Sequence, residues 1–529
     1  MTTTIQNIVI VGGGSAGWMS ATTFKSFFPD KNITVIESPN VPTVGVGEST
    51  LGGIRNWLHS VNIKEEDFFK HTNASYKMSI KFTDFYKKDA GAFHYPFGNP
   101  FLENAPEGLS EWQAKKLVYP ETPVNDYCRT FFPAMALIEN NKFLKNDKEE
   151  LMGHSHNHDV AYHFDAHMFA AWLRDSYCKP NGVNHIQDEV VSVSTSTDGV
   201  DHVVLTSGIQ ISADLFVDCT GWKSLLLGCA LTEPFTPYDH ILPNNRAWAV
   251  QVPYTDKEKE LEPYTNCTAI GNGWVWNIPL WSRLGTGYVY SDKHISPEDA
   301  LQEFKDHLNS KKMSTYNPNR VTDDLEFKDI KMRIGIHERT WVKNVVAIGL
   351  SAGFIEPLES NGLFSVHEFL LALVNIIDKD YVTQWDKDVY NTTVLDMFNN
   401  LAEFVSLHYA LSVRDDTPYW KEISKKTFCP NMVKQIPMLS KGFTDLVARK
   451  MNHRSHAGPG GIHCIATGMH YFVLSRVNKL NAEFIYSTDF KKHVDEFVSN
   501  RQMYQNHWQY IADTAPSLYE YLKTHVYTE

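Results

Sequence analysis

The 529-residue chain has the composition of an ordinary globular protein, with 43% hydrophobic and 21% charged residues. Its formal net charge of −13 and the lack of any basic run argue against a nucleic-acid partner. The seven cysteines are scattered without a Cys-x-x-Cys pair, no apolar run is long enough to span a membrane, and no signal peptide precedes the first strand. We therefore expect a soluble cytoplasmic protein with no membrane partner, large enough for two or more lobes.

The first element is a β-branched run, residues 7–11, followed by a glycine-rich turn and a helix to Phe28. A second strand, residues 33–36, ends in an acidic residue twenty positions past the last glycine of the turn. In this context the glycines let the backbone approach a pyrophosphate, the helix N-terminus stabilises its charge, and the acid binds ribose hydroxyls. The pattern predicts a dinucleotide site formed by Gly12, Gly14, Ser15, Ala16, Gly17 and Glu37.

Only one such fingerprint is visible, whereas an enzyme with separate flavin and nicotinamide sites would usually show two. This favours a bound flavin that receives its reducing power from elsewhere. A further glycine-bearing turn at residues 45–49 is either an ordinary loop or a second approach to the cofactor. In the latter case its contacting residues are Gly47, Glu48 and Ser49.

Residues 75–85 alternate between apolar and polar side chains, as in a half-buried strand. Lys77 and Lys81 lie on the polar face, where lysines are normally solvated. Spacing alone therefore gives little weight to a catalytic Lys77.

A segment with little periodicity, at about residues 85–160, reads as an insertion. It ends in a His-x-His-x-His run, residues 154–158, which invites a metal interpretation. No cysteine or carboxylate set with zinc spacing accompanies it, so we favour a polar loop and expect no metal.

The run at residues 273–279 places two tryptophans on one face of a strand that a proline ends. They are either an aromatic pair of the core or a rigid wall beside the cofactor. The residues of this candidate wall are Trp274, Trp276, Ile278 and Pro279.

Residues 344–362 begin as a short buried strand, pass two glycines, and then place Glu356 and Glu359 on either side of Pro357. Two carboxylates in an apolar segment can be an N-terminal charge pair for the helix that follows. The alternative is that one of them is catalytic. From residue 363 onward the pattern is mostly helical.

Taken together, these segments resemble the flavin-dependent halogenases of the tryptophan-halogenase family, from about residue 6 to about residue 420. The matching segments are Gly12-x-Gly14-x-x-Gly17-Trp18, Gly45-Val46-Gly47-Glu48, Tyr76-Lys77-Met78-Ser79-Ile80-Lys81-Phe82, Trp274-x-Trp276-x-Ile278-Pro279, Glu356-Pro357-Leu358-Glu359-Ser360 and Arg414-Asp415-Asp416-Thr417-Pro418. The tryptophan run is diagnostic among flavoproteins, whereas the glycine fingerprint is shared with many.

The resemblance implies an α/β, FAD-binding Rossmann-like fold of the glutathione-reductase type, as in flavoprotein monooxygenases, with a largely helical C-terminal lobe. The FAD-binding module would span residues 1–365, with the insertion inside it, and the helical lobe residues 366–529. A separate NAD(P)H-dependent flavin reductase would supply reduced FAD, which with dioxygen and a halide (chloride, bromide or iodide) gives hypohalous acid. By family likeness we also expect a homo-oligomer.

Residue roles follow from the same resemblance. Lys77 lies where the family carries its essential lysine, which receives hypohalous acid through a tunnel and activates it towards an electron-rich ring. Glu359 matches the catalytic glutamate that stabilises charge and removes the ring proton, and Asn361 and Gly362 would hold the halide. The further cofactor contacts in this reading are Val190, Leu350 and Leu363.

Two segments depart from the family. Asn361 stands where the family usually has threonine, and we expect halide preference to be decided there. Residues 456–467 lack the aromatic, acidic and asparagine side chains that bind free tryptophan, so we expect indoles, phenols or similar small aromatic substrates. The alternatives are a flavin-dependent aromatic hydroxylase, which would need no halide, and a non-catalytic flavin-binding protein.

Overall fold

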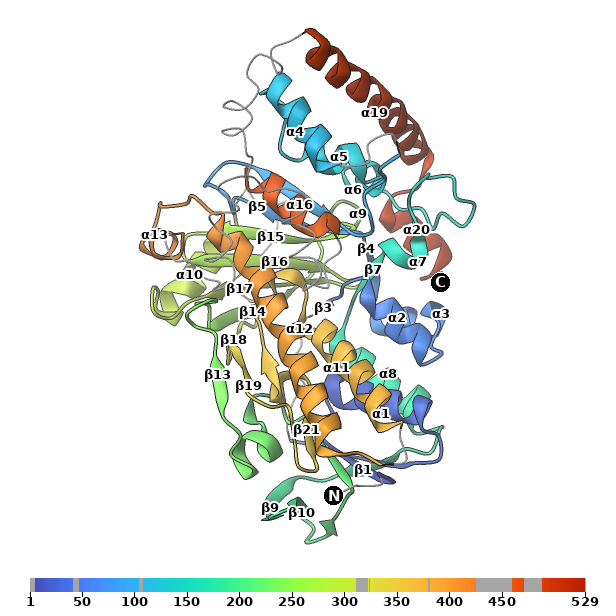
Figure 1. Ribbon diagram of the computed structural model, residues 1–529, viewed down its shortest axis with the longest axis vertical. Helices are drawn as coiled ribbons and strands as arrows, with labels where there is room; N and C mark the ends of the chain where they lie inside the picture. The colour runs from blue at the N-terminus through green and yellow to red at the C-terminus, as the bar shows by residue number, and fades with distance from the viewer. Residues whose placement is uncertain are drawn as a thin grey trace. The chain divides into compact units, whose positions relative to one another are not determined.

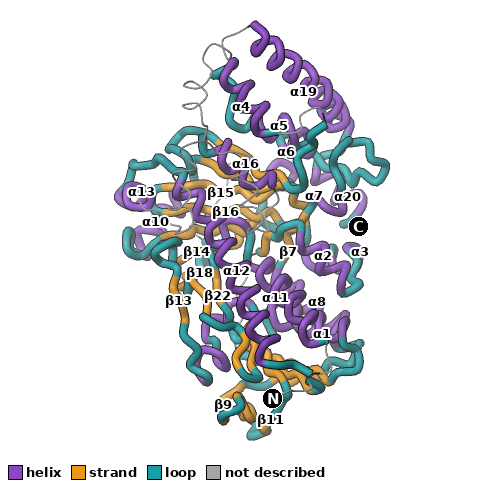
Figure 2. Tube along the Cα trace, in the orientation of Figure 1, coloured by secondary structure: helices purple, strands orange, loops and turns teal. Residues whose placement is uncertain are grey.

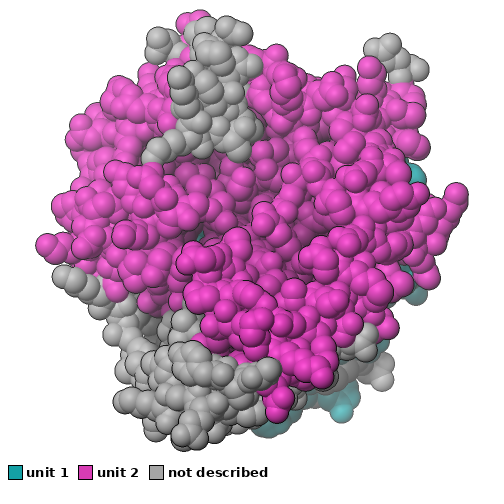
Figure 3. Space-filling view, turned by 90° about the horizontal axis from the view of Figure 1, so that it is seen from above, with its two compact units in different colours: residues 1–74, 163–247, 329–399 teal, residues 75–162, 248–328, 400–529 magenta. Residues whose placement is uncertain are grey.

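The computed structural model describes residues 5–40, 47–103, 108–310, 322, 324–378, 381–424, 459–470 and 488–528. The chain divides into two compact units, each assembled from three separated stretches (Figure 3). The first unit comprises residues 1–74, 163–247 and 329–399, and the second comprises residues 75–162, 248–328 and 400–529. The predicted lobe boundary near residue 365 stays a proposal.

The first unit is built on a six-stranded sheet with the strand order β20-β21-β12-β1-β2-β8. Figure 1 labels β1 and β21 of this sheet. Its strands are β1 (Asn7–Val11), β2 (Asn32–Glu37), β8 (Asn184–Gln187), β12 (Leu215–Asp218), β20 (Trp341–Val342) and β21 (Val345–Ala347). β1 lies in the middle and pairs in parallel with both β2 and β12. Its last four residues are all buried, as expected for a parallel strand covered on both faces. The predicted Rossmann-like fold is confirmed.

Helices cover this sheet because each parallel crossover needs one. α1 (Ser15–Phe27) connects β1 to β2, and α11 (Gly362–Ile377) packs against α1 and against α2 (Gly53–Ser60). The remaining helical segments are α3 (Glu65–Phe68), α8 (Ala166–Trp172), the 3-10 turns at Lys70–Thr72, Gly221–Lys223, Gly349–Ser351 and Pro357–Glu359, and the π-helical turns at Leu173–Cys178 and Leu225–Ala230.

Two small antiparallel sheets complete the first unit. One has the order β11-β10-β9 and the other β13-β19-β22. Their strands are β9 (Val190–Ser196), β10 (Gly199–Leu205), β11 (Gln210–Ile211), β13 (Phe235–Pro237), β19 (Gly335–His337) and β22 (Gly353–Phe354).

The second unit contains a larger, mainly antiparallel sheet, in which neighbouring strands follow the order β14-β17-β16-β15-β5-β6. Figure 2 labels β14, β15 and β16 of this sheet. The strands are β5 (Ser79–Thr83), β6 (Ala92–Pro96), β14 (Arg246–Val252), β15 (Tyr264–Ile270), β16 (Gly273–Pro279) and β17 (Leu284–Tyr290). β4 (Ser75–Lys77) directly precedes β5. One side of this sheet packs on α10 (Pro297–Leu308) through a cluster that includes Val275, Tyr288 and Phe304.

Short helices fill the segment read as an insertion, and longer ones follow after residue 400. These are α4 (Leu109–Val118), α5 (Asp126–Phe131), α6 (Ala134–Ile138), α7 (His156–Asp159), α13 (Pro418–Ile423), α16 (Pro459–Gly468), α19 (Thr488–Thr514) and α20 (Leu518–His525). The short α9 (Lys257–Glu260) precedes β15, and α12 (Gln384–Ala410) contributes residues to both units. In the described ranges, no helix combines the length and apolar character needed to cross a bilayer.

The predicted polar loop at residues 154–158 is wrong. His154 and His156 are both buried, and the ring of His156 packs edge-on against Tyr76 at 5.4 Å. His156 also begins α7, and His154 Nδ1 lies 3.6 Å from an Asp159 carboxylate oxygen. The prediction assumed that a run of polar residues would be exposed to solvent. A histidine can nevertheless be buried when its imidazole ring packs on other aromatic rings.

Candidate active site

The glycine turn after β1 is shaped to receive a pyrophosphate. Gly12 has a φ of +115°, and a Cβ there would lie 2.2 Å from the Cys219 carbonyl oxygen, so no other residue fits. Gly14 faces open space, since a Cβ there would meet nothing within 4 Å. α1 starts at the next residue and carries no acidic side chain in its first turn. Its N–H groups and positive dipole end therefore remain available for an anion, and the residues present fit a dinucleotide.

The acid that ends β2 is held by two basic residues that the sequence did not reveal. Glu37 Oε2 lies 2.8 Å from His185 Nε2 and 3.7 Å from the Arg174 guanidinium. Burial lowers the pKa of His185, while the Glu37 carboxylate opposes that shift. His185 reaches Glu37 because β8 pairs in parallel with β2. Since β8 lies about 150 residues further along the chain, no local spacing could have indicated this contact.

The turn at residues 47–49 meets the segment that follows Glu359. Ser49 and Ser360 share a hydrogen bond of 3.0 Å between their hydroxyl oxygens, and a Cβ on Gly362 would lie 3.7 Å from Glu48 Oε2. Burial raises the pKa of Glu48 to about 7. Gly45 and Val46, the other residues of this predicted motif, lie outside the described residues.

The two glutamates near residue 357 have different surroundings. Glu356 Oε2 accepts a 2.7 Å hydrogen bond from Asn244 Nδ2, and its backbone carbonyl accepts one from Asn361 Nδ2 at 3.1 Å. Glu359 is 1% exposed and ends the short 3-10 turn, after which Ser360 has a φ of +58°. The first turn of α11 contains no acidic residue, and its N-cap residue Asn361 forms no side-chain cap hydrogen bond. Glu356 thus bonds to Asn244 and Asn361, and the interpretation of the pair as a charge pair at the start of the helix stays a prediction.

Three further predicted cofactor contacts lie in the first unit. Val190 begins β9 and is 8% exposed, Leu350 lies in the 3-10 turn after β21, and Leu363 is buried in the first turn of α11. Their role as contacts stays a proposal.

Lys77 is buried in the second unit, contrary to the expectation of a solvated polar face. It is 0% exposed, and its Nζ lies 4.9 Å from the centroid of the Phe97 ring. Phe97 follows β6, and its backbone N–H donates to the Met78 carbonyl, which fixes the ring beside the lysine. Lys81 lies on the next strand, β5, and is only partly buried, with its Nζ 5.4 Å from the Tyr264 ring. The expected single half-buried strand is wrong, because residues 75–80 are all buried and the two lysines belong to different strands.

The two tryptophans of β16 lie on one face, as predicted. Their ring centroids are 6.2 Å apart at an interplanar angle of 58°. Trp276 lies over Gly287, where a Cβ would come within 2.1 Å of its ring, and the Trp274 indole N–H has no hydrogen-bond acceptor in the part of the chain that the structure describes. The chain continues through the buried Ile278 to Pro279, whose carbonyl accepts a 2.5 Å hydrogen bond from the Ser75 hydroxyl. Ser75 begins the strand that carries Lys77.

The candidate residues are thus shared between the units. The first unit holds the glycine turn, Glu37, Glu48, Glu359 and Asn361, and the second holds Lys77 and the tryptophan pair. The structure adds three residues to the candidate site residues predicted from the sequence, namely Phe97, Arg174 and His185.

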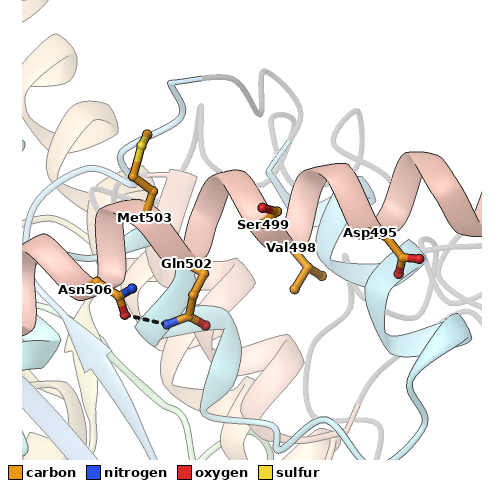
Figure 4. A pocket seen from close by; sticks show the side chains of 6 residues that line it. All are labelled: Asp495, Val498, Ser499, Gln502, Met503 and Asn506. Carbon is orange, nitrogen blue, oxygen red and sulfur yellow. Dashed lines mark hydrogen bonds between the residues drawn. The ribbon is translucent and has the colours of Figure 1, made fainter.

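A separate hollow of about 560 Å³ lies along the exposed side of α19 (Figure 4). Its lining residues are Asp495, Val498, Ser499, Gln502, Met503 and Asn506, and Gln502 donates a 2.8 Å hydrogen bond to Asn506. None of the candidate residues lines it, so it is distinct from the site described above.

Comparison with known proteins defines the class of this site. The tryptophan halogenase family model matches residues 7–459. The tryptophan 6-halogenase SttH of Streptomyces toxytricini is 35% identical over 442 residues, covering 79% of this chain and 80% of SttH. The tryptophan 7-halogenase RebH of Lentzea aerocolonigenes is 33% identical and covers 83% and 82% of the two chains.

Solved structures agree over almost the whole length. The apo structure of VirX1 superposes with a TM-score of 0.88 at 35% identity, covering 99% of both chains. The crystal structure of SttH gives a TM-score of 0.84 at 32% identity, covering 98% of this chain and 99% of SttH. The fold and site define a flavin-dependent enzyme of the halogenase type. The chain belongs to the tryptophan halogenase family, and the predicted resemblance is confirmed.

Proposed function

We propose that the protein is a two-component halogenase in which Lys77 transfers an oxidised halogen to an electron-rich aromatic ring. The observation that carries this proposal is Lys77 itself, a fully buried lysine beside an aromatic ring in a chain of this family. Most lysines keep their ammonium group in water, since burying a charge is costly, so complete burial distinguishes Lys77 from an ordinary surface lysine. A buried nitrogen is suited instead to meet a small neutral oxidant and to hydrogen-bond it.

Reduced FAD would be held by the glycine turn, with its pyrophosphate at the N-terminus of α1 and a ribose at Glu37. When bound, the flavin supplies the reduction of dioxygen that oxidises halide to hypohalous acid. Arg174 and His185 keep the Glu37 carboxylate in place. With a single dinucleotide site, the electrons come from a separate NAD(P)H-dependent reductase.

The halide would rest on the turn at residues 360–362. Gly362 begins a 16-residue helix, whose free N–H groups favour an anion. The Glu48 carboxyl lies beside Gly362, and with its pKa at about 7 half of the molecules carry a neutral Glu48 at neutral pH. A neutral carboxyl repels halide less than a carboxylate does, so this pKa favours halide binding.

Glu359 would act on the ring after the halogen has been transferred. A desolvated carboxylate stabilises a developing cationic ring and can accept the proton that leaves it. The neighbouring Glu356 accepts a hydrogen bond from Asn244, and we assign it a structural role in the loop.

For the substrate, we propose an indole, a phenol or a similarly electron-rich small aromatic. SttH and RebH are named for tryptophan, but residues 456–467 differ from the family segment that contacts free tryptophan. Of that segment, residues 459–467 lie in α16, and residues 456–458 are outside the described ranges. A homo-oligomer and a cytoplasmic location also remain proposals.

The test is an incubation of the protein with FAD, a flavin reductase, NADH, halide and a panel of arenes, followed by mass spectrometry. Halogenated product should form with the wild type and be lost in Lys77→Ala. Lys81→Ala changes a partly buried lysine on the next strand, β5, and is the matched control that should keep the activity. Product that persists undiminished in Lys77→Ala would refute the role of Lys77, and oxygenated product without added halide would instead indicate a hydroxylase.

A further inference from the structure

A second lysine lies against an aromatic ring of the second unit, outside the proposed active site. Lys257 is the first residue of α9, and its Nζ lies 3.1 Å from the centroid of the Trp281 ring. The same indole stacks on Tyr527 at 4.3 Å with an interplanar angle of 1°, and on Tyr519 at 5.8 Å. We call these four residues the Lys257 cluster. Lys257 and Trp281 are both only partly buried, so a small solute can reach them.

The charged groups around Lys257 do not neutralise its charge. On α9, Lys259 pairs with Asp256, the Glu260 carboxylate accepts from the Thr255 and Asp256 backbone, and Glu258 is exposed. On the opposing segment, Lys523 Nζ lies 5.6 Å from the Tyr519 ring. Within the described ranges, Lys257 forms no ion pair with a carboxylate, and the aromatic rings are the contacts it does form.

Burial without a counter-charge lowers the pKa of Lys257 to about 8. At pH 7 about one molecule in ten then carries a free amine there, against about one in three thousand for a lysine of ordinary pKa. A desolvated free amine is the form in which lysine acts as a nucleophile. The cluster therefore holds a reactive nitrogen directly over an indole.

The cluster also lies near the start of the strand that carries Lys77. Trp281 is two residues beyond Pro279, whose carbonyl binds the Ser75 hydroxyl, and Ser75 and Lys77 are the two ends of β4. An amine beside an electron-rich ring is also the arrangement proposed for Lys77 and its substrate. In the Lys257 cluster, however, the ring belongs to the protein.

We propose that Trp281 is a self-halogenation site, at which Lys257 captures hypohalous acid that has left the active site and passes the halogen to the indole. In the first step the amine lone pair attacks the halogen. An N–halogen bond forms, the halogen–oxygen bond breaks, and the departing hydroxide leaves as water with a proton from the nitrogen. In the second step the indole π electrons attack the halogen. A carbon–halogen bond forms, the N–halogen bond breaks, and the ring proton returns to the nitrogen, so hypohalous acid is the one oxidant consumed.

This inference rests on the proposed function for its supply of hypohalous acid, so the experiment has two arms. In the first, a limiting amount of hypobromous acid is added to the resting protein without flavin, and bromine on each tryptophan is quantified by peptide mass spectrometry. In the second, the protein turns over with FAD, reductase, NADH and bromide but without an arene. The first arm tests the cluster even if the protein makes no oxidant of its own.

Trp385 is the internal control because it is 75% exposed and has no lysine over its ring among the described residues. Exposed sulfur groups such as Met503 also consume oxidant, but they gain oxygen and not halogen, so the ratio of bromine on the two tryptophans is the measured quantity. We expect more bromine on Trp281 than on Trp385, with the ratio rising about five-fold from about pH 7 to about pH 8 as the free amine of Lys257 increases.

Lys257→Met should lower bromination of Trp281 by about ten-fold while leaving Trp385 unchanged, because only Trp281 depends on the amine. Lys257→Arg keeps a cation over the ring but lacks a nucleophilic amine at neutral pH, and it should lose the labelling as well. Unchanged far-ultraviolet circular dichroism and melting would show that both variants fold. Labelling that follows exposure alone, or that persists in Lys257→Arg, would overturn the proposal. A Trp281 labelled in the first arm but not in the second, in a preparation that halogenates arenes, would show that hypohalous acid does not reach the cluster and would overturn the proposal. The same result in a preparation that halogenates no arene would refute the proposed function instead.

Discussion

Two lysines of the second unit lie against aromatic rings, and their surroundings differ in two respects. Lys77 is 0% exposed with its Nζ 4.9 Å from Phe97, whereas Lys257 is partly exposed with its Nζ 3.1 Å from Trp281. A benzene ring gives up its π electrons to an electrophile far less readily than an indole. Phe97 can therefore border an oxidised halogen without consuming it, while Trp281 cannot. In the two proposed roles, burial and an unreactive neighbouring ring distinguish the lysine that acts on an external substrate from the lysine that acts on the protein itself.

The largest expected effect tests this difference directly. Lys77→Ala should lower arene halogenation by about a thousand-fold, the range in which a positioned proton-transfer group contributes. Lys257→Met should leave it within about two-fold, since Lys257 does not meet the substrate. Initial rates of product formation by liquid chromatography measure both. A comparable loss of arene halogenation in the two variants would show that the difference in burial does not give the two lysines different roles.

A somewhat smaller loss is expected at Glu359. Glu359→Gln keeps the shape of the side chain but removes the charge and the proton acceptor, and kcat should fall by about a hundred-fold. The control is Glu356→Gln, which alters the acceptor of the Asn244 hydrogen bond and should lower the melting temperature more than kcat. A kcat that falls in Glu356→Gln but not in Glu359→Gln would contradict the proposed roles.

The pH dependence of halide use should depend on Glu48. Its pKa of about 7 means that the carboxyl is mostly neutral below that pH and mostly charged above it. Because the charged form repels an anion at Gly362, the apparent KM for bromide should rise several-fold from about pH 6 to about pH 8. Glu48→Gln should flatten this rise. If the KM for bromide rises equally with pH in that variant, Glu48 does not take part in halide binding.

The smallest effect is expected at Asn361. Its amide donates to the Glu356 carbonyl at 3.1 Å, a contact that a threonine side chain is too short to form in the same way. Asn361→Thr should change the product ratio in a chloride and bromide competition measurably, but by less than about ten-fold, or about 1.4 kcal/mol. An unchanged ratio would mean that halide preference is decided elsewhere.

The sequence predicted those parts of the site that depend on local spacing. The turn from Gly12 to Gly17, the acid at the end of β2 and the shared face of Trp274 and Trp276 are all found as expected. In each case the geometry follows from residues a few positions apart, or from one βαβ unit.

Features that depend on distant segments could not be predicted. The burial of Lys77 depends on what covers a strand face, and the partners of Glu37 come from β8 and the adjoining π-helical turn, far along the chain. Residues 459–461, with the sequence Pro-Gly-Gly, form the first turn of α16, although proline and glycine often interrupt helices. A proline is tolerated at the start of a helix, so the same residues permit either conformation.

The central claim is that Lys77 transfers the halogen but does not take part in forming hypohalous acid. The most direct test supplies wild type and Lys77→Ala with reduced FAD, dioxygen and bromide, and follows two products in one reaction: bromine captured by a soluble trap and brominated arene. We predict that Lys77→Ala matches the wild type in total oxidised bromide, all of it in the trap, while the arene product disappears. Brominated arene at the wild-type rate, or loss of the trapped bromine together with the arene, would contradict this division of roles.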